Sequence, residues 1–78
     1  MFTKITYRKT GQTYWYDKSD FLGGCWHIFV SPNHNAHVYN IFSEKEFNER
    51  FEPFNEKKCK KYVDAFKQGK QEFNAFPI

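Results

Sequence analysis

The sequence predicts an α+β domain: an antiparallel sheet of about four strands, with two C-terminal helices packed on one face. Three observations lead there. The first half of the chain holds four runs in which apolar and polar residues alternate, as in half-buried strands. The second half holds two segments with apolar residues three or four positions apart, as on a helix face. This order of elements is typical of α+β folds, and 78 residues make one small domain, 1–78.

The first two strands are expected within residues 2–10 and 13–17. In the first, Ile5 and Tyr7 share one face, and a Gly-Gln pair can turn the chain back. The second, "TYWYD", is rich in β-branched and aromatic residues. Residues 18–24, "KSDFLGG", then break the pattern, and two glycines give the backbone the freedom that a loop needs.

A second hairpin follows in residues 25–31 and 36–42. The turn-forming sequence "PNHN" separates the two strands, which indicates a connection of about four or five residues. We expect one face to carry Trp26, Ile28, Val30, Val38 and Asn40. We expect the other face to carry Cys25, His27, Phe29, His37, Tyr39 and Ile41.

The first helix is expected to begin after Ser43. The Ser43 hydroxyl accepts from the Glu46 amide in such a capping box, and the Glu46 carboxylate reaches back to the Ser43 amide. Phe47 and Phe51 then fall on one side, facing the sheet. Pro53 ends the helix after about two turns, because it disfavours helical geometry in the residue before it.

The second helix is expected to begin after Asn55 and to end near Gly69. Its apolar face is formed by Cys59, Tyr62, Val63 and Phe66. Residues 71–78 keep several apolar side chains, so we expect this tail to dock on the domain or to pair as an edge strand.

Composition narrows the class of protein. Phe, Tyr and Trp make up 22% of the residues, and a core of rings suits a chain of this length. A net charge of +3 permits an anionic partner without requiring one. No apolar run approaches the roughly 20 residues that span a bilayer, and the first residues do not read as a basic-then-apolar leader, so we expect neither a leader nor a membrane partner. The two cysteines are expected to be reduced thiols in a cytoplasmic protein.

No complete catalytic or metal-binding motif is present. Cys25, His27, His34 and His37 could together supply a tetrahedral zinc set, but their spacing contains no CxxC pair. A reactive Cys25 would also need an orienting group and an oxyanion site. We therefore expect no metal, no cofactor and no enzymatic activity.

Five lysines of the second helix form a positive strip that Lys70 extends just beyond the helix, namely Lys57, Lys58, Lys60, Lys61 and Lys67. This strip is either a solvated helix face or a contact for phosphates or an acidic protein surface. Lysine suits nonspecific charge contacts better than bidentate base recognition, which argues against sequence-specific DNA binding.

The run Tyr14-Trp15-Tyr16 is the second candidate for partner contact. In a strand, either Trp15 or the two tyrosines must point away from the core. The rings could form a second buried cluster, or anchor a protein interface, where Tyr and Trp are enriched. With Arg8 and Lys9 nearby, they could also stack on single-stranded bases.

The stretches "GGCWHIFV" and "HVYNIFSEKEFNERFEP" resemble a class of small phage and prophage proteins of unknown function. In that class a glycine-led strand and a Tyr-bearing strand lead into a short helix that closes on aromatic-Glu-Pro. The matching positions are Gly24, Trp26, Ile28, Val30, Tyr39, Phe47, Phe51, Glu52 and Pro53. The long hairpin loop and the lysine-rich second helix depart from the pattern. The resemblance implies a phage-type origin and no catalytic residues.

These observations predict a small non-enzymatic binding protein in the cytoplasm of an infected bacterial host. It would inhibit or modulate a host protein or ribonucleoprotein machine stoichiometrically, for example in an anti-defence or anti-CRISPR role. Tyr14, Trp15 and Tyr16 would anchor the partner, with lysine steering from the second helix. The alternative is a nucleic-acid-binding module that uses Arg8, Lys9, Lys57 and Lys61. The sequence does not define an oligomeric state.

Overall fold

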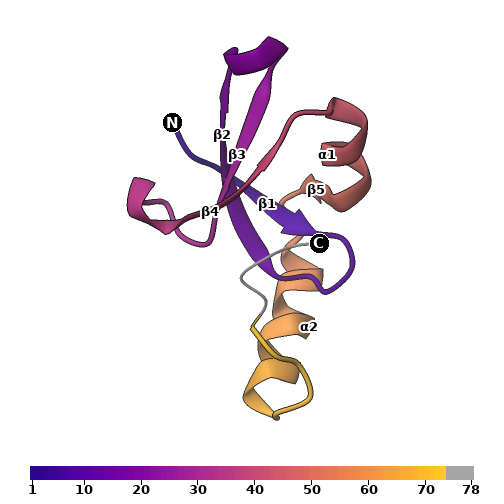
Figure 1. Cartoon of the computed structure of the whole chain (residues 1–78). Coiled ribbons are helices and arrows are strands. Elements are labelled where there is room, and N and C mark those ends of the chain that lie inside the picture. The colour runs from indigo at the N-terminus through magenta and orange to yellow at the C-terminus, as the bar shows by residue number, and fades with distance from the viewer. Residues whose placement is uncertain (74–78) are drawn as a thin grey trace.

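The computed structural model describes residues 1–73, which form an antiparallel five-stranded sheet and two α-helices (Figure 1). The strands follow the order β4-β3-β2-β1-β5 across the sheet. In chain order the elements are β1 (Thr3–Tyr7), β2 (Thr13–Ser19), β3 (Cys25–Phe29), β4 (His37–Ile41), α1 (Glu44–Arg50), β5 (Phe51–Pro53) and α2 (Glu56–Lys67). The α+β class is confirmed. The end of the predicted docking tail, residues 74–78, lies outside the described residues.

Strand β5 corrects the expected count of about four strands. Phe51–Pro53 pairs antiparallel with Ile5–Tyr7 and forms one edge of the described sheet. Pro53 is tolerated there because an edge position leaves its missing N–H facing away from the ladder. Three residues are too few to show strand alternation, and Phe51 was assigned to the preceding helix because it lies four positions after Phe47.

One face of the sheet carries the core, built largely from aromatic rings as the composition indicates. Its buried residues are Ile5, Tyr7, Tyr14, Trp26, Ile28, Ile41 and Phe51. The Tyr14 ring lies edge-on to Tyr7 at 6.0 Å and to Phe51 at 5.7 Å between centroids, a favourable geometry for aromatic pairs. Helix α1 covers this face through Phe47, which stacks on Trp26 at 5.4 Å.

The expected faces of β4 were wrong for three residues. Tyr39 and Ile41 pack on the core face, whereas Asn40 lies on the opposite face beside His27. The register pairs are Trp26↔Ile41, His27↔Asn40, Ile28↔Tyr39 and Phe29↔His37. Val38 is therefore an extra residue in β4, a bulge, and the alternation reverses after it. A one-residue shift exchanges the faces of every following side chain.

Helix α1 begins as predicted, with the Ser43 hydroxyl accepting from the Glu46 amide at 3.3 Å. The reciprocal half of the capping box differs. The Glu46 carboxylate instead accepts from the Tyr39 hydroxyl at 3.3 Å and pairs with Arg50 at 3.0 Å. This carboxylate therefore ties α1 to the neighbouring strand β4.

Helix α2 also begins and ends where the sequence indicates. The Asn55 side chain accepts from the Lys58 amide at 3.2 Å, which satisfies one free N–H of the first turn. At the other end Gly69 adopts φ 73°, and its N–H donates to the Phe66 carbonyl. The Lys70 N–H donates to the Ala65 carbonyl, which completes a Schellman motif.

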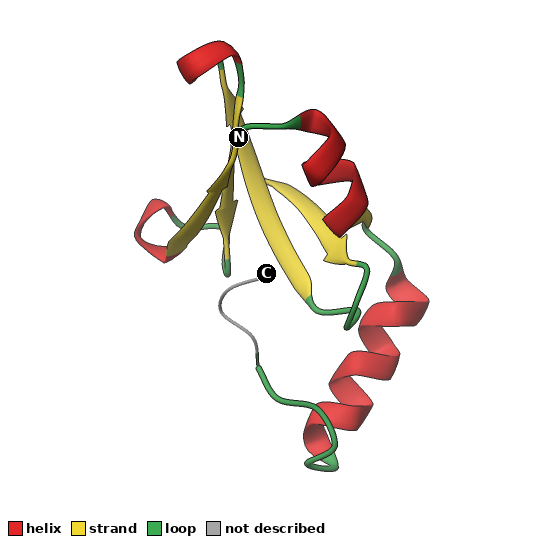
Figure 2. Ribbon diagram, turned by 45° about the vertical axis from the view of Figure 1, so that its right-hand side comes forward, coloured by secondary structure: helices red, strands yellow, loops and turns green. Residues whose placement is uncertain are grey.

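The structure does not show both helices packed on one face of the sheet, as the sequence predicted. The Asn55 N–H donates to Thr6 Oγ1 at 2.8 Å, and Cys59 Sγ lies 3.2 Å from Thr13 Oγ1. Both threonines alternate with core residues of their strands, so these two contacts of α2 lie on the face opposite the core. Figure 2 shows α2 continuing beyond the end of the strands. No helix in residues 1–73 is long and apolar enough to cross a membrane.

Candidate functional site

The structure does not place the three rings of the Tyr14-Trp15-Tyr16 run on one exposed surface. Tyr14 is fully buried, and this burial, followed by the charges of Tyr62 and Tyr7, raises the pKa of its hydroxyl. Tyr16 is half-buried and lies edge-on to Phe47 at 5.0 Å. Tyr14 is therefore a core residue, which corrects its assignment as a partner anchor.

Trp15 lies on the opposite face from the two tyrosines and is half-buried. Its strand neighbours are Lys4 in β1 and Phe29 in β3. It keeps some accessible ring surface, but Tyr14 and Tyr16 cannot act with it because their side chains point the other way. The run therefore divides between the two faces, as strand geometry requires.

The predicted basic residues are brought together more closely than the aromatic ones. Arg8 and Lys9 follow β1, and Lys58 and Lys61 come from α2. These four line a hollow of about 260 Å³ together with Thr10 and Gly11, and we call it the basic hollow. Lys57 and Lys60 are exposed on α2 but do not line it, and Lys60 pairs with Glu56 at 3.7 Å.

A glycine allows the β1–β2 turn to approach α2 this closely. Gly11 adopts φ +87°, which L side chains rarely adopt, and a Cβ added there would lie 2.6 Å from the Lys58 carbonyl oxygen. Any other residue would push the turn away from the helix. The turn that carries Lys9 is thereby held against the first turn of α2.

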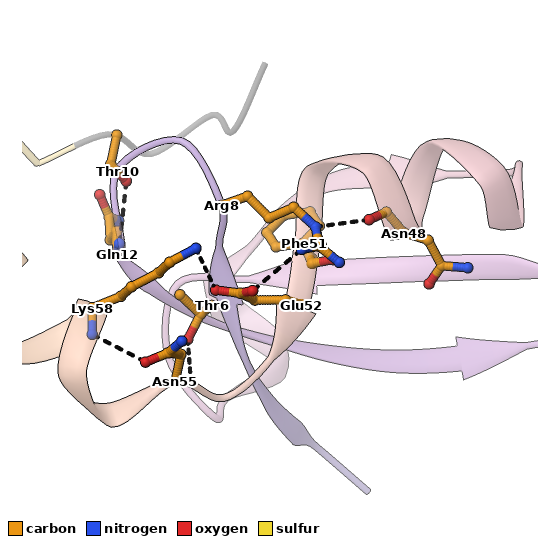
Figure 3. A network of polar contacts seen from close by, with 9 residues as sticks. All are labelled: Thr6, Arg8, Thr10, Gln12, Asn48, Phe51, Glu52, Asn55 and Lys58. Atoms are coloured by element: carbon orange, nitrogen blue, oxygen red, sulfur yellow. Dashed lines mark hydrogen bonds and ion pairs between the residues drawn. The ribbon is translucent and has the colours of Figure 1, made fainter.

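Glu52 of β5 is an internal counterion at this site. One of its carboxylate oxygens lies 2.8 Å from Lys58 Nζ and the other 3.2 Å from Arg8 Nη1, as Figure 3 shows. The hydrogen bond from Lys58 is the largest influence that lowers the pKa of Glu52, and the charges of Lys58 and Arg8 add to it. Arg8 Nε also donates to the carbonyls of Asn48 at 2.9 Å and Phe51 at 3.0 Å.

The remaining two cations of the basic hollow are not neutralised in this way. Among residues 1–73, neither Lys9 nor Lys61 forms an ion pair. The hollow thus combines two cations that are oriented by Glu52 with two whose charge is available to a ligand.

An exposed apolar cluster includes two residues of the β2–β3 connection, the segment at the top of Figure 1. Phe21 is 61% exposed, Leu22 is 74% exposed and Phe42, just after β4, is 49% exposed. The rings of Phe21 and Phe42 lie 6.4 Å apart. We call these three residues the apolar tip.

The backbone of Leu22 is in the left-handed region, with φ 52° and ψ 39°. Non-glycine residues in that region are strained, and such strain is concentrated at functional loops. The apolar tip was not expected, because "KSDFLGG" has the composition of a simple loop. Two large apolar residues directly before a glycine pair were the available signal.

A polar network links side chains of β2, β3 and β4 on the face of the sheet opposite the core. Ser19 Oγ lies 2.9 Å from His27 Nε2, and His27 Nδ1 lies 2.9 Å from Asn40 Oδ1. Because Asn40 Oδ1 can only accept, His27 Nδ1 donates to it. His37 Nε2 donates to the same oxygen at 2.6 Å. His27 and His37 were candidates from residue type, but their link to Ser19 and Asn40 depends on the pairing of three strands.

This network has the order of groups found in nucleophilic serine sites, but such a site also needs N–H donors directed at an oxyanion. The nearby Phe21 N–H donates to Ser19 Oγ itself, at 3.4 Å. Cys25 is buried, and burial raises the pKa of its thiol, which makes it a poor nucleophile. Within the described chain no three His, Cys, Asp or Glu side chains are arranged to hold a metal ion.

The fold is a small α+β domain that carries an apolar tip and a basic hollow at separate places on its surface. The chain matches no protein-family model, no curated protein and no solved structure in the comparisons made. The resemblance to small phage proteins therefore stays a prediction.

Proposed function

We propose that this chain is a small non-enzymatic binding protein that acts stoichiometrically on a host protein or protein–RNA machine. It would occupy a surface of that partner and so inhibit or modulate it, in the cytoplasm of an infected bacterium. The phage origin and the anti-defence or anti-CRISPR role come from the sequence resemblance alone. The contact surface is argued from the structure.

The observation that carries the proposal is the exposure of the apolar tip. Fully burying a Phe or Leu side chain contributes about 1.5–3 kcal/mol. Its three members are between 49% and 74% exposed, so a partner that covers them gains about half or more of that amount from each. Since about 1.4 kcal/mol is a tenfold change in Kd, the tip alone supplies an affinity gain of roughly a hundredfold or more.

The position of Leu22 supports a contact function over an accidental exposure. Leu22 is exposed and also has a strained left-handed backbone, a conformation that glycine adopts without strain. Two further large apolar side chains lie beside it instead of in the core. Clustered apolar exposure of this kind marks interaction sites on small proteins.

The test compares partner capture by matched variants. Purified wild-type protein, Phe21→Ser/Phe42→Ser and Phe54→Ser are each immobilised and exposed to lysate of a candidate bacterial host. Phe54 is 38% exposed and does not belong to the tip, so its variant is the control. We expect a stoichiometric partner with the wild type and the control, and its loss with the tip variant.

Urea denaturation of the three proteins accompanies the capture experiment, because the comparison requires that all of them are folded. A partner retained equally by the folded tip variant would contradict the apolar tip as the contact surface. Turnover of any small substrate by the isolated protein would contradict the non-enzymatic part of the proposal.

A further inference from the structure

We propose that the basic hollow binds the phosphate backbone of a nucleic-acid strand, with Lys9 and Lys61 as the main contacts. This site is separate from the apolar tip and does not depend on the partner that the tip takes. Its ligand is recognised by charge and shape, independently of base sequence.

The first support is convergence. Lys9 and Lys61 lie far apart in the sequence, yet both line one hollow of about 260 Å³. The Gly11 backbone makes this convergence possible, since a side chain there would collide with the Lys58 carbonyl. The backbones that carry the two lysines thus lie on packed segments, which keeps both side chains at the same hollow before a ligand arrives.

The second support is the division of roles among the cations. Glu52 pairs with Arg8 and Lys58, and two backbone carbonyls hold the Arg8 guanidinium in addition. These two side chains are therefore ordered, and part of their charge is neutralised. Lys9 and Lys61 have no such counterion among the described residues, so an incoming anion meets their full charge.

The third support concerns the class of anion. None of the described residues that line the hollow is aromatic, so it offers no stacking surface for bases. A concave group of cations suits a compact phosphodiester, whose oxygens can contact more than one ammonium group at once. Lysines act as point charges and suit phosphate contact without base recognition.

The experiment measures binding of a fluorescein-labelled oligo(dT) strand by fluorescence anisotropy at several salt concentrations. Each phosphate contact to a single strand contributes about 0.7 to the slope of log K against log salt. Raising salt from about 50 mM to about 200 mM should then weaken binding about sevenfold if only two lysines contact phosphates, and about fiftyfold if all four cations do.

The variant Lys9→Gln/Lys61→Gln should lose most of this binding and lower the salt slope by about 0.7 for each lysine. Its matched control is Lys45→Gln/Lys70→Gln, which removes the same charge from exposed lysines that do not line the hollow. Equal losses in the two variants would overturn the hollow as the site, because net charge alone would then explain binding.

Glu52→Gln tests the counterion role. Removing the carboxylate charge frees Arg8 and Lys58 for the ligand, so we expect tighter binding and a steeper salt slope. Arg8 keeps its bonds to the Asn48 and Phe51 carbonyls, so the guanidinium stays in place. Weaker binding by a folded Glu52→Gln protein, checked by circular dichroism, would overturn this assignment.

Competition separates phosphate from other anions. Inorganic tripolyphosphate should displace the labelled strand, whereas poly-glutamate of equal charge concentration should displace it poorly. Equal competition by poly-glutamate would overturn the phosphate assignment in favour of an acidic protein surface. The Phe21→Ser/Phe42→Ser variant should bind oligo(dT) like the wild type, so failure of this inference and failure of the proposed function are distinguishable.

Discussion

Replacing Leu22 with glycine should leave the protein about as stable as the wild type while removing the most exposed side chain of the apolar tip. The Leu22 backbone lies at φ 52°, a region that costs an L-residue about 1–2 kcal/mol and costs glycine almost nothing. Glycine at Leu22 relieves this strain in the folded state, but it adds about 0.5–1 kcal/mol of chain entropy that folding must overcome.

The side chain itself contributes little to stability. Leu22 is 74% exposed, so about a quarter of a full Leu burial is lost on truncation, which is roughly 0.5 kcal/mol. These contributions nearly cancel, and we expect Leu22→Gly to lie within about 1 kcal/mol of the wild type. Leu22→Ala loses the same contacts but keeps the strained backbone. The free energy of unfolding of Leu22→Gly should therefore be higher than that of Leu22→Ala by up to about 1 kcal/mol.

Urea denaturation followed by Trp fluorescence measures both variants, since the Trp26 ring is buried in the core. Both should lose partner capture to a similar extent, because both lack the Leu22 side chain. If Leu22→Gly is less stable than Leu22→Ala, the left-handed backbone is not strained, and the argument from strain to function fails.

Three further predictions concern the core, the basic hollow and the thiols. Phe47→Ala should lower the free energy of unfolding by about 3 kcal/mol in urea denaturation, whereas the more exposed Phe54→Ala should cost less than half of that; equal losses would mean that Phe47 does not anchor α1. The pKa of Glu52 is lowered from its ordinary value of 4.5, so its contribution to stability is present above that pH and is lost as pH falls through the lowered value. The free energy of unfolding should therefore fall less steeply with decreasing pH in Glu52→Gln than in the wild type. An equally steep fall in both proteins would show that Glu52 is not stabilised as an anion. Cys25 is fully buried with a raised pKa and Cys59 is partly accessible, so DTNB should modify Cys59 first in the native protein and both at similar rates in urea; faster modification of Cys25 would place its thiol at the surface.

The elements that sequence patterns identified depend on residues close together in the chain. Ser43 and Asn55 each satisfy an amide three residues later, so their helix starts could be found locally. Gly69 ends α2 because of its own backbone conformation. The first four strands likewise follow from alternation within single runs.

The elements that sequence patterns missed depend on contacts between distant segments. β5 is a strand because Phe51–Pro53 meets β1, and a three-residue segment has no alternation to recognise. The bulge at Val38 depends on how β4 pairs with β3, and it decides that Tyr39 faces the core and Asn40 does not. The pattern of apolar and polar residues within β4 does not predict which of them face the core.

The candidate sites divide in the same way. Arg8, Lys9, Lys58 and Lys61 were identified from residue type, but their convergence around one hollow required the packing of the β1–β2 turn on α2. Tyr14 was assigned to a surface, although alternation in its run left open which rings point inward.

By itself, the sequence determined the class of the domain, most of its strands and both helix starts. It also determined that the domain is rich in aromatic and lysine side chains. Tertiary structure alone decided which rings are buried, which strand closes the sheet and which cations share a ligand. The physical reason is that caps and periodicity arise from bonds between near neighbours. Burial and charge clustering instead depend on which distant surfaces meet when the chain folds.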